Sequence, residues 1–327
     1  MTSEKTPLSQ VQLGQNGPMI GVQGLGCMGM SEFYGDTDEA ESRLTLERAI
    51  ELGVNMFDTA DMYGVGANEE FLASFLSVHR KQTIIATKFG YRRTPERPDD
   101  WSIDNRPEYI RAAVDRSLQR LGTDVIDLYY MHRRTDGVVL EDSVGAMADL
   151  VRAGKVKWLG LSAVTASELR AAHTIHPIAA VQSEWSIFTR AIEQDVVPAA
   201  AELGVTVVPY SPLGRGMLTG RAFATSLTAT DARQQFPRFS AENRAANMLL
   251  VAKIEDIALS RDVSSAQVAL AWLYTQGRKL KVKTVPIPGT RKRSRLMENV
   301  AAASLVLSEP EMEALAPLAS AVQGVSV

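Results

Sequence analysis

The sequence predicts an α/β fold, a (β/α)8 or TIM barrel, in which parallel strands form a closed ring inside a layer of helices. Short apolar runs rich in Val, Ile and Leu alternate with amphipathic helical patterns, as expected for strands that are buried on both faces. The alternation continues along all 327 residues without a change in composition. Several runs end in one charged or hydroxyl-bearing residue, which is how a barrel presents functional groups at its carboxyl end. We therefore expect residues 1–327 to form one barrel domain.

The first element along the chain is a predicted β-hairpin, which we expect to cap the barrel. Its strands, residues 11–13 and 19–22, flank the turn-forming sequence Gly14-Gln15-Asn16-Gly17. The barrel strands follow, and we predict them at residues 22–25, 55–58, 83–88, 126–132, 157–162, 179–183, 206–210 and 284–287.

Amphipathic patterns between these strands predict the outer helices. The segment 107–121 is typical, with Pro107 at its start and Gly122 directly after its end, where each residue favours a helix cap. The other helices are predicted at 38–52, 68–77, 141–152, 166–173, 192–203, 243–260, 264–276 and 294–303, and a last helix is expected after Ser308. The longest interruption, residues 213–243, is predicted to be a loop at the barrel rim, and loops of that length are usually functional.

The charge, the cysteine content and the hydropathy of the chain argue against several classes of function. A formal net charge of −3 gives no electrostatic reason to expect nucleic acid or an anionic membrane as a partner. Cys27 is the single cysteine, so neither an internal disulfide nor a multi-cysteine metal site is possible. His173 and His176 have no third ligand near them in sequence, so no metal is expected. We see neither a secretory signal nor a run of about 20 apolar residues, which indicates a cytoplasmic protein.

The segment Gly24-Leu25-Gly26-Cys27-Met28-Gly29 matches the GxGxxG fingerprint of dinucleotide-binding folds. That fingerprint requires a helix that starts at the third glycine, because the helix N-terminus binds the pyrophosphate. Here the next predicted helix begins only near Asp38. We interpret the segment instead as a loop after the first barrel strand, whose glycines allow a ligand to approach the backbone closely.

Four polar residues at the predicted strand ends together suggest one reaction. Asp58, Tyr63, Lys88 and His132 lie at or just past the carboxyl ends of successive strands. Reduction of a carbonyl by hydride needs a proton donor at the substrate oxygen, and a nearby ammonium would lower the pKa of a tyrosine from its usual value of about 10. Tyr63 would then be the general acid, with Lys88 supplying the charge. Asp58 would hold Lys88, and His132 would hydrogen-bond the carbonyl oxygen.

Each of these residues taken alone has an ordinary structural explanation, as a helix cap, a packing residue or a solvated rim charge. Only the set of four on one face of the barrel, with matching flanking residues, indicates catalysis.

The flanking residues are also what makes the chain resemble the aldo-keto reductase superfamily, from about Leu8 to Leu318. The resemblance rests on five strings of sequence: residues 57–64 (FDTADMYG), 120–130 (RLGTDVIDLYY), 154–156 with 160–162 (GKV, GLS), 209–216 (PYSPLGRG) and 288–291 with 298–299 (PGTR, EN). The Asp, Tyr, Lys and His that are catalytic in that family fall on Asp58, Tyr63, Lys88 and His132. Two positions depart from the family pattern, since Ala163 stands where many relatives have Asn or Glu, and Trp185 stands where Tyr is common.

The resemblance implies a binding site for NADP(H) along the barrel rim. The nicotinamide would stack on Tyr210, and its carboxamide would be held by Ser162 and Gln182. The pyrophosphate would lie at the loop formed by Ser211, Pro212, Leu213, Gly214, Arg215 and Gly216. The adenine and the 2'-phosphate would lie along Ile287, Gly289, Thr290, Arg291, Arg295, Glu298 and Asn299.

A bound 2'-phosphate would explain the basic run at residues 291–295, because arginines at a helix start can bind its compact negative charge with paired hydrogen bonds. Lys292 and Arg293 have a second interpretation, as solvated surface charges.

Four residues of the predicted rim loops are candidates for the substrate pocket, namely Cys27, Met28, Trp101 and Arg133. A buried and unreactive thiol is an equally good interpretation of Cys27, and packing within its own loop is a plainer one for Trp101. Arg133 and its neighbour Arg134 would favour an anionic substrate unless they bind only water or loop carbonyls.

The sequence therefore predicts an NADPH-dependent oxidoreductase that converts a small aldehyde or ketone to an alcohol. The alternative on the same fold is a redox-sensing or channel-associated regulatory subunit, which would bind NADP(H) and turn over little substrate. Because no long segment lies outside the predicted barrel to serve as an effector, we expect the enzyme.

Overall fold

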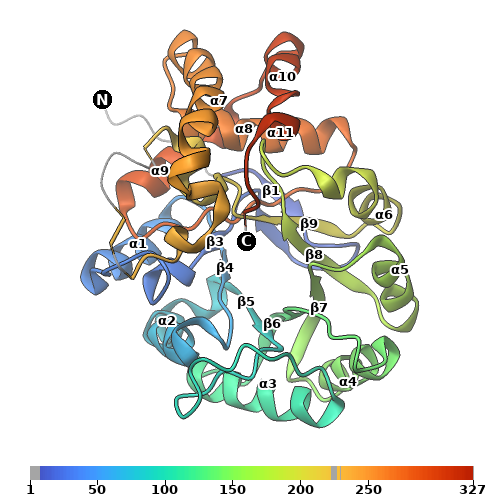
Figure 1. The fold of residues 1–327 in the computed structure, drawn as a ribbon. Helices are drawn as coiled ribbons and strands as arrows, with labels where there is room; N and C mark the ends of the chain where they lie inside the picture. The colour runs from blue at the N-terminus through green and yellow to red at the C-terminus, as the bar shows by residue number, and fades with distance from the viewer. Residues whose placement is uncertain (1–7, 222–226, 229, 327) are drawn as a thin grey trace.

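A parallel barrel forms the centre of the computed structural model, which describes residues 8–221, 227–228 and 230–326 (Figure 1). The predictions for the N-terminal segment 1–7 and for residues 222–226 and 229 of the long rim loop lie outside the described residues. The strands are hydrogen-bonded in chain order as β3 (Leu25–Gly26), β4 (Met56–Asp58), β5 (Ile84–Phe89), β6 (Ile126–Met131), β7 (Val156–Ser162), β8 (Ile178–Glu184) and β9 (Thr206–Tyr210).

The segment 284–289 fills the eighth position and closes the ring between β9 and β3. Single parallel bridges join Thr284 to Val207 and Gly289 to Gly26. The segment does not form a regular strand, because Pro286 and Pro288 have no N–H to donate to a ladder. The predicted (β/α)8 barrel is confirmed, with one irregular member.

Helices surround this ring (Figure 1). They are α1 (Glu39–Glu51), α2 (Ala67–His79), α3 (Pro107–Leu121), α4 (Leu140–Arg152), α5 (Ala166–Ile175), α6 (Val196–Glu202), α7 (Ala241–Ser260), α8 (Ser265–Lys279), α9 (Arg293–Ala301), α10 (Glu309–Leu315) and α11 (Leu318–Ala321). The helix α3 has the predicted bounds and ends at Gly122, whose φ of 62° suits glycine.

Two sequence expectations about helices meet different outcomes. The helix α1 starts well past Gly29, with the Asp38 side chain capping it. The GxGxxG segment therefore leads into the short 3-10 turn Met28–Met30 and opens no α-helix. The helix predicted at 192–203 is interrupted, because Asp195 has a non-helical backbone (φ −139°) and caps the N–H of Val196. A 3-10 turn, Ala191–Gln194, therefore precedes the shorter helix α6.

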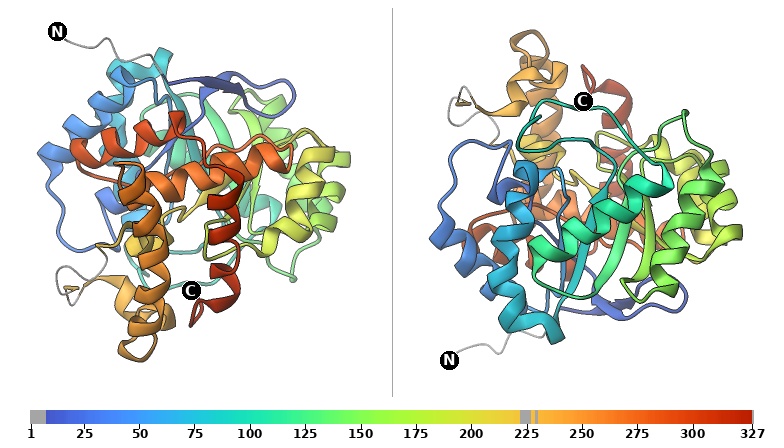
Figure 2. Two further views of the ribbon diagram at one scale, coloured as in Figure 1. Left: turned by 90° about the horizontal axis from the view of Figure 1, so that it is seen from above. Right: turned by 90° about the horizontal axis from the view of Figure 1, so that it is seen from below.

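The predicted hairpin, β1 (Gln10–Gln12) with β2 (Met19–Gly21), closes the amino-terminal end of the barrel. Leu13 and Ile20 are fully buried and belong to the apolar cluster inside the ring. The Gly14 N–H donates to Thr206 Oγ1 at 2.9 Å, which fastens the hairpin to β9. Figure 2 shows the hairpin at the end of the barrel opposite the loop formed by residues 90–105.

Inside the ring, the side chains of alternate strand residues fill the barrel. Met56, Leu128, Tyr130 and Val208 are fully buried there. A Cβ added at Gly160 would lie 2.4 Å from the Tyr130 ring, so this glycine makes room for the large interior tyrosine. Because side chains alternate along a strand, residues two positions further on also point inward, at the carboxyl end.

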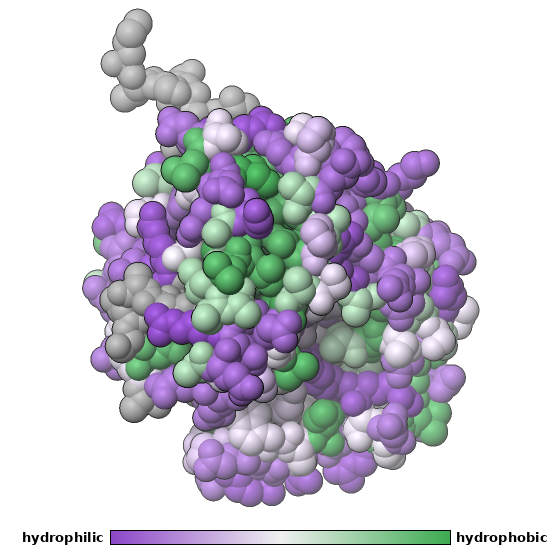
Figure 3. Space-filling model, turned by 45° about the horizontal axis from the view of Figure 1, so that its top comes forward, coloured by the Kyte–Doolittle hydropathy of each residue, from purple (hydrophilic) through white to green (hydrophobic). Residues whose placement is uncertain are grey.

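The face of the molecule drawn in Figure 3 is largely hydrophilic, with apolar patches between the polar side chains. The most exposed large apolar residues among those described are Leu259, at 81%, and Leu249 and Val78, each at 73%. No helix in the described parts of the chain has the length and apolar character that a membrane span requires.

Candidate active site

Asp58, Lys88 and His132 point into the carboxyl end of the barrel from three neighbouring strand positions. Each follows an interior residue of β4, β5 or β6 by two positions, and each is buried. The register of parallel strands thus brings together side chains that are far apart in the sequence.

Lys88 forms the centre of the polar cluster. Its fully buried ammonium donates to Asp58 Oδ1, to the Thr59 carbonyl at 2.7 Å and to the Tyr63 hydroxyl at 3.5 Å, which uses all three N–H groups. Burial has the largest single effect on the pKa of Lys88 and would lower it, but the Asp58 carboxylate and the Tyr63 hydroxyl together outweigh burial and raise the pKa. The pKa of Asp58 is itself raised by burial, against the opposing effect of Lys88. Lys88 therefore stays protonated.

Tyr63 reaches Lys88 from the 3-10 turn Tyr63–Gly66, which follows β4. Gly64 and Val65 in this turn both have φ values of 56°, and this left-handed path redirects the chain toward α2. Burial raises the pKa of the Tyr63 phenol, and the Lys88 ammonium acts in the opposite direction. Lys88 acts to lower the pKa of the phenol, as expected, but burial raises this pKa by more. The phenol is therefore protonated near neutral pH.

His132 lies beside Tyr63, with the ring centres 5.9 Å apart and nearly perpendicular. Burial lowers the pKa of His132 well below 6.5, and the charges of Lys88 and Arg133 act in the same direction. Its Nδ1 atom is buried and has no hydrogen-bond partner among the described residues. A neutral imidazole in this position can exchange hydrogen bonds with a ligand without carrying charge.

Asn68 fixes the backbone around the cluster. It accepts a hydrogen bond from Thr59 Oγ1 at 2.6 Å and donates to the Cys27 carbonyl at 2.9 Å, which joins the loops after β3 and β4. Cys27 is fully buried in the main core, and burial raises the pKa of its thiol. Its side chain is therefore shielded from solvent, and its role stays a prediction.

Aromatic side chains from the rim loops surround Tyr63. Phe33 lies 6.5 Å from the Tyr63 ring and 6.4 Å from Trp101, and Tyr91 lies 5.2 Å from the His132 ring, measured between ring centres. Met28 packs in the same cluster as Tyr63. Met28 and Trp101 are among the residues predicted from the sequence, whereas Phe33 and Tyr91 are not. The only signal for these two is an aromatic residue in a rim loop, and it does not show where the loop folds.

The residues expected at the nicotinamide lie on the next three strands. Ser162 and Gln182 are register partners of β7 and β8, and Tyr210 ends β9 with a partly exposed ring. Gln182 donates through Nε2 to Asp58 Oδ2 at 2.7 Å. Arg133 donates to Ser162 Oγ at 3.1 Å and lies 3.5 Å from the Tyr210 hydroxyl. The expected cofactor residues and the tetrad of Asp58, Tyr63, Lys88 and His132 are thus one connected group.

The loop 211–216 continues from Tyr210 with a left-handed backbone. Ser211, Gly214, Arg215 and Gly216 all have positive φ values, between 48° and 94°. The Nε–H of Arg215 is buried and has no acceptor among the described residues, while its guanidinium lies 4.4 Å from the Phe236 ring centre. An unpaired buried donor on a glycine-rich turn suits an anionic ligand such as a pyrophosphate.

The basic residues before and within α9 have different partners. Arg291 donates to the Tyr34 carbonyl at 2.7 Å and to Thr37 Oγ1 at 3.1 Å, so it holds the first rim loop. Arg293 pairs with Glu41 at 2.9 Å. Arg295 is exposed, and no carboxylate in the described parts of the chain pairs with it. Gly289, Thr290 and Glu298 lie in the same region at the surface or partly buried, whereas Asn299 and Ile287 are buried.

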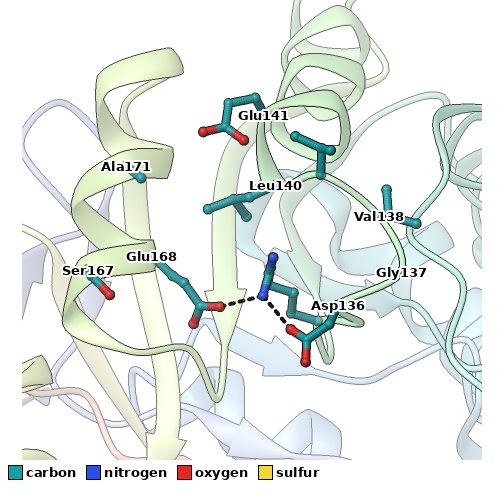
Figure 4. A pocket seen from close by; sticks show the side chains of 10 residues that line it. Asp136, Gly137, Val138, Leu140, Glu141, Ser167, Glu168 and Ala171 are labelled. Carbon is teal, nitrogen blue, oxygen red and sulfur yellow. Dashed lines mark hydrogen bonds and ion pairs between the residues drawn. The ribbon is translucent and has the colours of Figure 1, made fainter.

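A surface hollow of about 460 Å³ lies between α4 and α5 but contains none of the tetrad residues (Figure 4). Arg134 lies in it and pairs with Asp136 at 2.8 Å and with Glu168 at 2.9 Å. The charge of Arg134 is therefore balanced by two carboxylates, whereas its neighbour Arg133 has no carboxylate partner within the described residues.

The chain is similar to known proteins over most of its length. A profile of the aldo/keto reductase family matches residues 24–319. The chain is 41% identical over 309 residues to "Probable aldo-keto reductase 1" of Glycine max, covering 93% of this chain and 87% of that protein. The glycerol dehydrogenase AKR11B4 of Gluconobacter oxydans superimposes with a TM-score of 0.83, at 25% identity and with 94% of each chain covered. The holo form of AKR11C1 from Bacillus halodurans gives 0.75, at 27% identity and with 97% and 98% covered.

The family match and the curated relative define the class, an oxidoreductase that acts on carbonyl groups, in a family that uses a nicotinamide cofactor. The chain belongs to the aldo/keto reductase family.

Proposed function

We propose that this protein is an NADPH-dependent reductase that converts a small aldehyde or ketone to an alcohol, with Tyr63 as the general acid. The observation that supports this most strongly is the contact of the Tyr63 hydroxyl with the buried ammonium of Lys88, beside His132. When bound, NADPH would supply the hydride that reduces the carbonyl carbon.

Tyr63 is suited to give the proton that the carbonyl oxygen gains. Burial keeps the pKa of its phenol high, so the proton is present at neutral pH. As the oxygen develops negative charge, the Lys88 ammonium stabilises the phenolate that Tyr63 becomes, and Asp58 keeps Lys88 in place. His132, neutral because burial lowers its pKa, would hold the carbonyl oxygen through a hydrogen bond.

The residues that would hold the cofactor follow the strand ends around the rim. Tyr210 offers a ring for the nicotinamide, and Ser162 with Gln182 would bind its carboxamide. The loop of Ser211, Pro212, Leu213, Gly214, Arg215 and Gly216 would bind the pyrophosphate. The segment containing Ile287, Gly289, Thr290, Arg291, Arg295, Glu298 and Asn299 would hold the adenosine half.

NADPH is favoured over NADH because Arg295 is an exposed cation without a carboxylate partner in the described residues, on the first turn of α9. A 2'-phosphate would provide that partner. Arg291 would contribute indirectly, since its hydrogen bonds hold the first rim loop against this end of the site.

The expected substrate is small and mainly apolar around its carbonyl. Met28, Phe33, Tyr91 and Trp101 surround Tyr63 with apolar and aromatic surface. Arg133 is the one cation near Tyr63 without a carboxylate partner among the described residues.

The proposal is tested by following NADPH oxidation with a panel of small aldehydes and ketones, and then with NADH in place of NADPH. The reverse reaction is assayed with NADP⁺ and glycerol, because one structural relative is named a glycerol dehydrogenase. We expect turnover with several carbonyl compounds and a preference for NADPH. Tight binding of NADPH without turnover of any substrate would overturn the proposal in favour of a regulatory subunit that senses cofactor state.

A further inference from the structure

Ser162 and Gln182 form a pair of polar side chains at the carboxyl end of the barrel. They are register partners of the neighbouring strands β7 and β8, so both point inward at the same height. A hydroxyl can donate or accept, and a side-chain amide can present either its oxygen or its NH₂ group. The pair alone would therefore leave four combinations of donor and acceptor open.

Arg133 orients the hydroxyl group of Ser162. Its guanidinium donates to Ser162 Oγ at 3.1 Å and to the His132 carbonyl at 2.7 Å. A guanidinium has only donors, so Ser162 Oγ must accept in this contact. The hydroxyl proton of Ser162 is then directed away from Arg133, and Ser162 is left as a hydrogen-bond donor toward the site.

Asp58 orients the side-chain amide of Gln182, and leaves an acceptor where Arg133 leaves a donor. Its Oδ2 receives a hydrogen bond from Gln182 Nε2 at 2.7 Å, while Lys88 donates to the other oxygen, Oδ1. A carboxylate paired with an ammonium can only accept, so Gln182 must turn its NH₂ group toward Asp58. The carbonyl oxygen of Gln182 is left as an acceptor.

We propose that Arg133 is a positioning residue that acts through Ser162, and that Arg133 and Asp58 together preset the pair to offer one donor and one acceptor. A primary carboxamide has one acceptor oxygen and one NH₂ donor, so the preset pair matches it in a single orientation. This inference rests on the proposed function, because it assigns the preset pair to the nicotinamide carboxamide.

The test measures the dissociation constants of NADP⁺ and of two analogues by titration calorimetry. Thionicotinamide adenine dinucleotide phosphate replaces the carboxamide oxygen with sulfur, a weak acceptor, and therefore probes the Ser162 donor. The 3-acetylpyridine analogue replaces the NH₂ group with a methyl group and probes the Gln182 acceptor. For the wild-type protein, we expect each analogue to bind about 3- to 10-fold more weakly than NADP⁺, the usual effect of one lost hydrogen bond.

Variants of Arg133 and Asp58 should change the binding penalties of the two analogues independently. In Arg133→Met, the penalty for the thio analogue should fall below about 2-fold, while the penalty for the acetyl analogue stays, because only Ser162 is released. In Asp58→Asn, the pattern should be reversed, because Lys88 keeps the asparagine oxygen and the asparagine NH₂ group then faces Gln182. Gln182 must turn its carbonyl oxygen toward that NH₂ group and no longer offers an acceptor to the ligand. Thermal unfolding of each variant checks that the fold is retained, and Arg133→Lys should restore the wild-type pattern because an ammonium is also only a donor.

Arg134→Met is the matched control, because the Arg134 side chain pairs with Asp136 and Glu168 instead. Both penalties should be unchanged in it. If Arg133→Met keeps the wild-type penalty for the thio analogue, or loses both penalties equally, Arg133 does not set Ser162 and the inference is wrong. If the wild-type protein binds none of the three nucleotides, the proposed function itself fails.

Discussion

The two ends of the candidate site are built in opposite ways. Around Lys88, charged groups are buried and find their partners within the chain, since Asp58, the Thr59 carbonyl and Tyr63 use all three of its donors. Around α9, the charged groups are exposed, and Arg295 has no carboxylate partner in the described residues.

The buried end is therefore suited to the chemical step, and the exposed end to the binding of the cofactor. Two opposite charges in the protein interior interact strongly. Little reorganisation is needed during the reaction, because these groups are already oriented. An exposed cation is screened by water and salt until a ligand covers it. We therefore expect changes at the buried end to affect turnover and stability, and changes at the exposed end to affect the choice of cofactor.

The strongest effect is expected at Tyr63. Replacing Tyr63 by Phe removes the proton donor but keeps the ring, so kcat should fall by about 10²- to 10⁴-fold. The dissociation constant for NADPH should stay near the wild-type value. Stopped-flow measurement of NADPH oxidation at saturating substrate gives the first quantity, and fluorescence titration gives the second. A Phe variant with a near-normal rate on several substrates would show that another group gives the proton.

The Lys88→Met variant tests the buried pair through stability. It leaves the Asp58 carboxylate buried without its ammonium, which should cost about 3–5 kcal/mol in the free energy of unfolding. Urea unfolding near neutral pH measures it. The control is Lys155→Met, which breaks the surface pair with Asp115, whose side chains are 39% and 57% exposed. That change should leave the midpoint nearly unchanged, and equal losses in both variants would remove the contrast between buried and exposed pairs.

The Arg295→Ala variant tests the exposed end. Loss of one charge-assisted contact to a 2'-phosphate should weaken NADPH binding about tenfold and leave NADH binding unaffected. Arg293→Ala is the matched control, because Arg293 already pairs with Glu41 and a phosphate would have to compete for it. If Arg293 rather than Arg295 determines the ratio of the two affinities, our assignment of the phosphate site is wrong.

A pH-dependent effect on stability is expected from His132. Burial lowers the pKa of His132 in the folded protein below its value in the unfolded chain, so the unfolded chain binds the additional proton. The stabilising contribution is complete above about pH 6.5 and is lost as the pH falls from there toward the folded pKa, by at most about 1.4 kcal/mol per pH unit. Urea unfolding at pH 7 and pH 5 should show a smaller difference for His132→Gln than for wild type. An identical difference would mean that His132 takes up its proton equally well in the folded state.

The sequence predicted the barrel well because its strands carry a simple signal. Buried strands such as β5 and β6 are mainly apolar, and Pro107 and Gly122 mark both ends of α3. The eighth strand, predicted at residues 284–287, is not a regular strand, because Pro286 and Pro288 interrupt hydrogen bonding within this apolar run.

Within the site, residues fixed by strand register could be predicted, whereas residues fixed by loops could not. Lys88 and Asp58 meet because their strands are neighbours. The different partners of Arg291, Arg293 and Arg295 depend on where the first rim loop folds, and three nearby basic residues in a sequence do not reveal that. Phe33 was missed for the same reason, since its loop reaches Tyr63 only in three dimensions.

We expect the Tyr63 hydroxyl to lie beside the reactive ring of a bound nicotinamide nucleotide. A crystal structure of the protein with NADP⁺ tests it most directly. The account predicts the nicotinamide ring against Tyr210, with its carboxamide at Ser162 and Gln182 and with Tyr63 and His132 next to its reactive carbon. A nucleotide bound elsewhere, or a nicotinamide ring kept away from Tyr63, would contradict it.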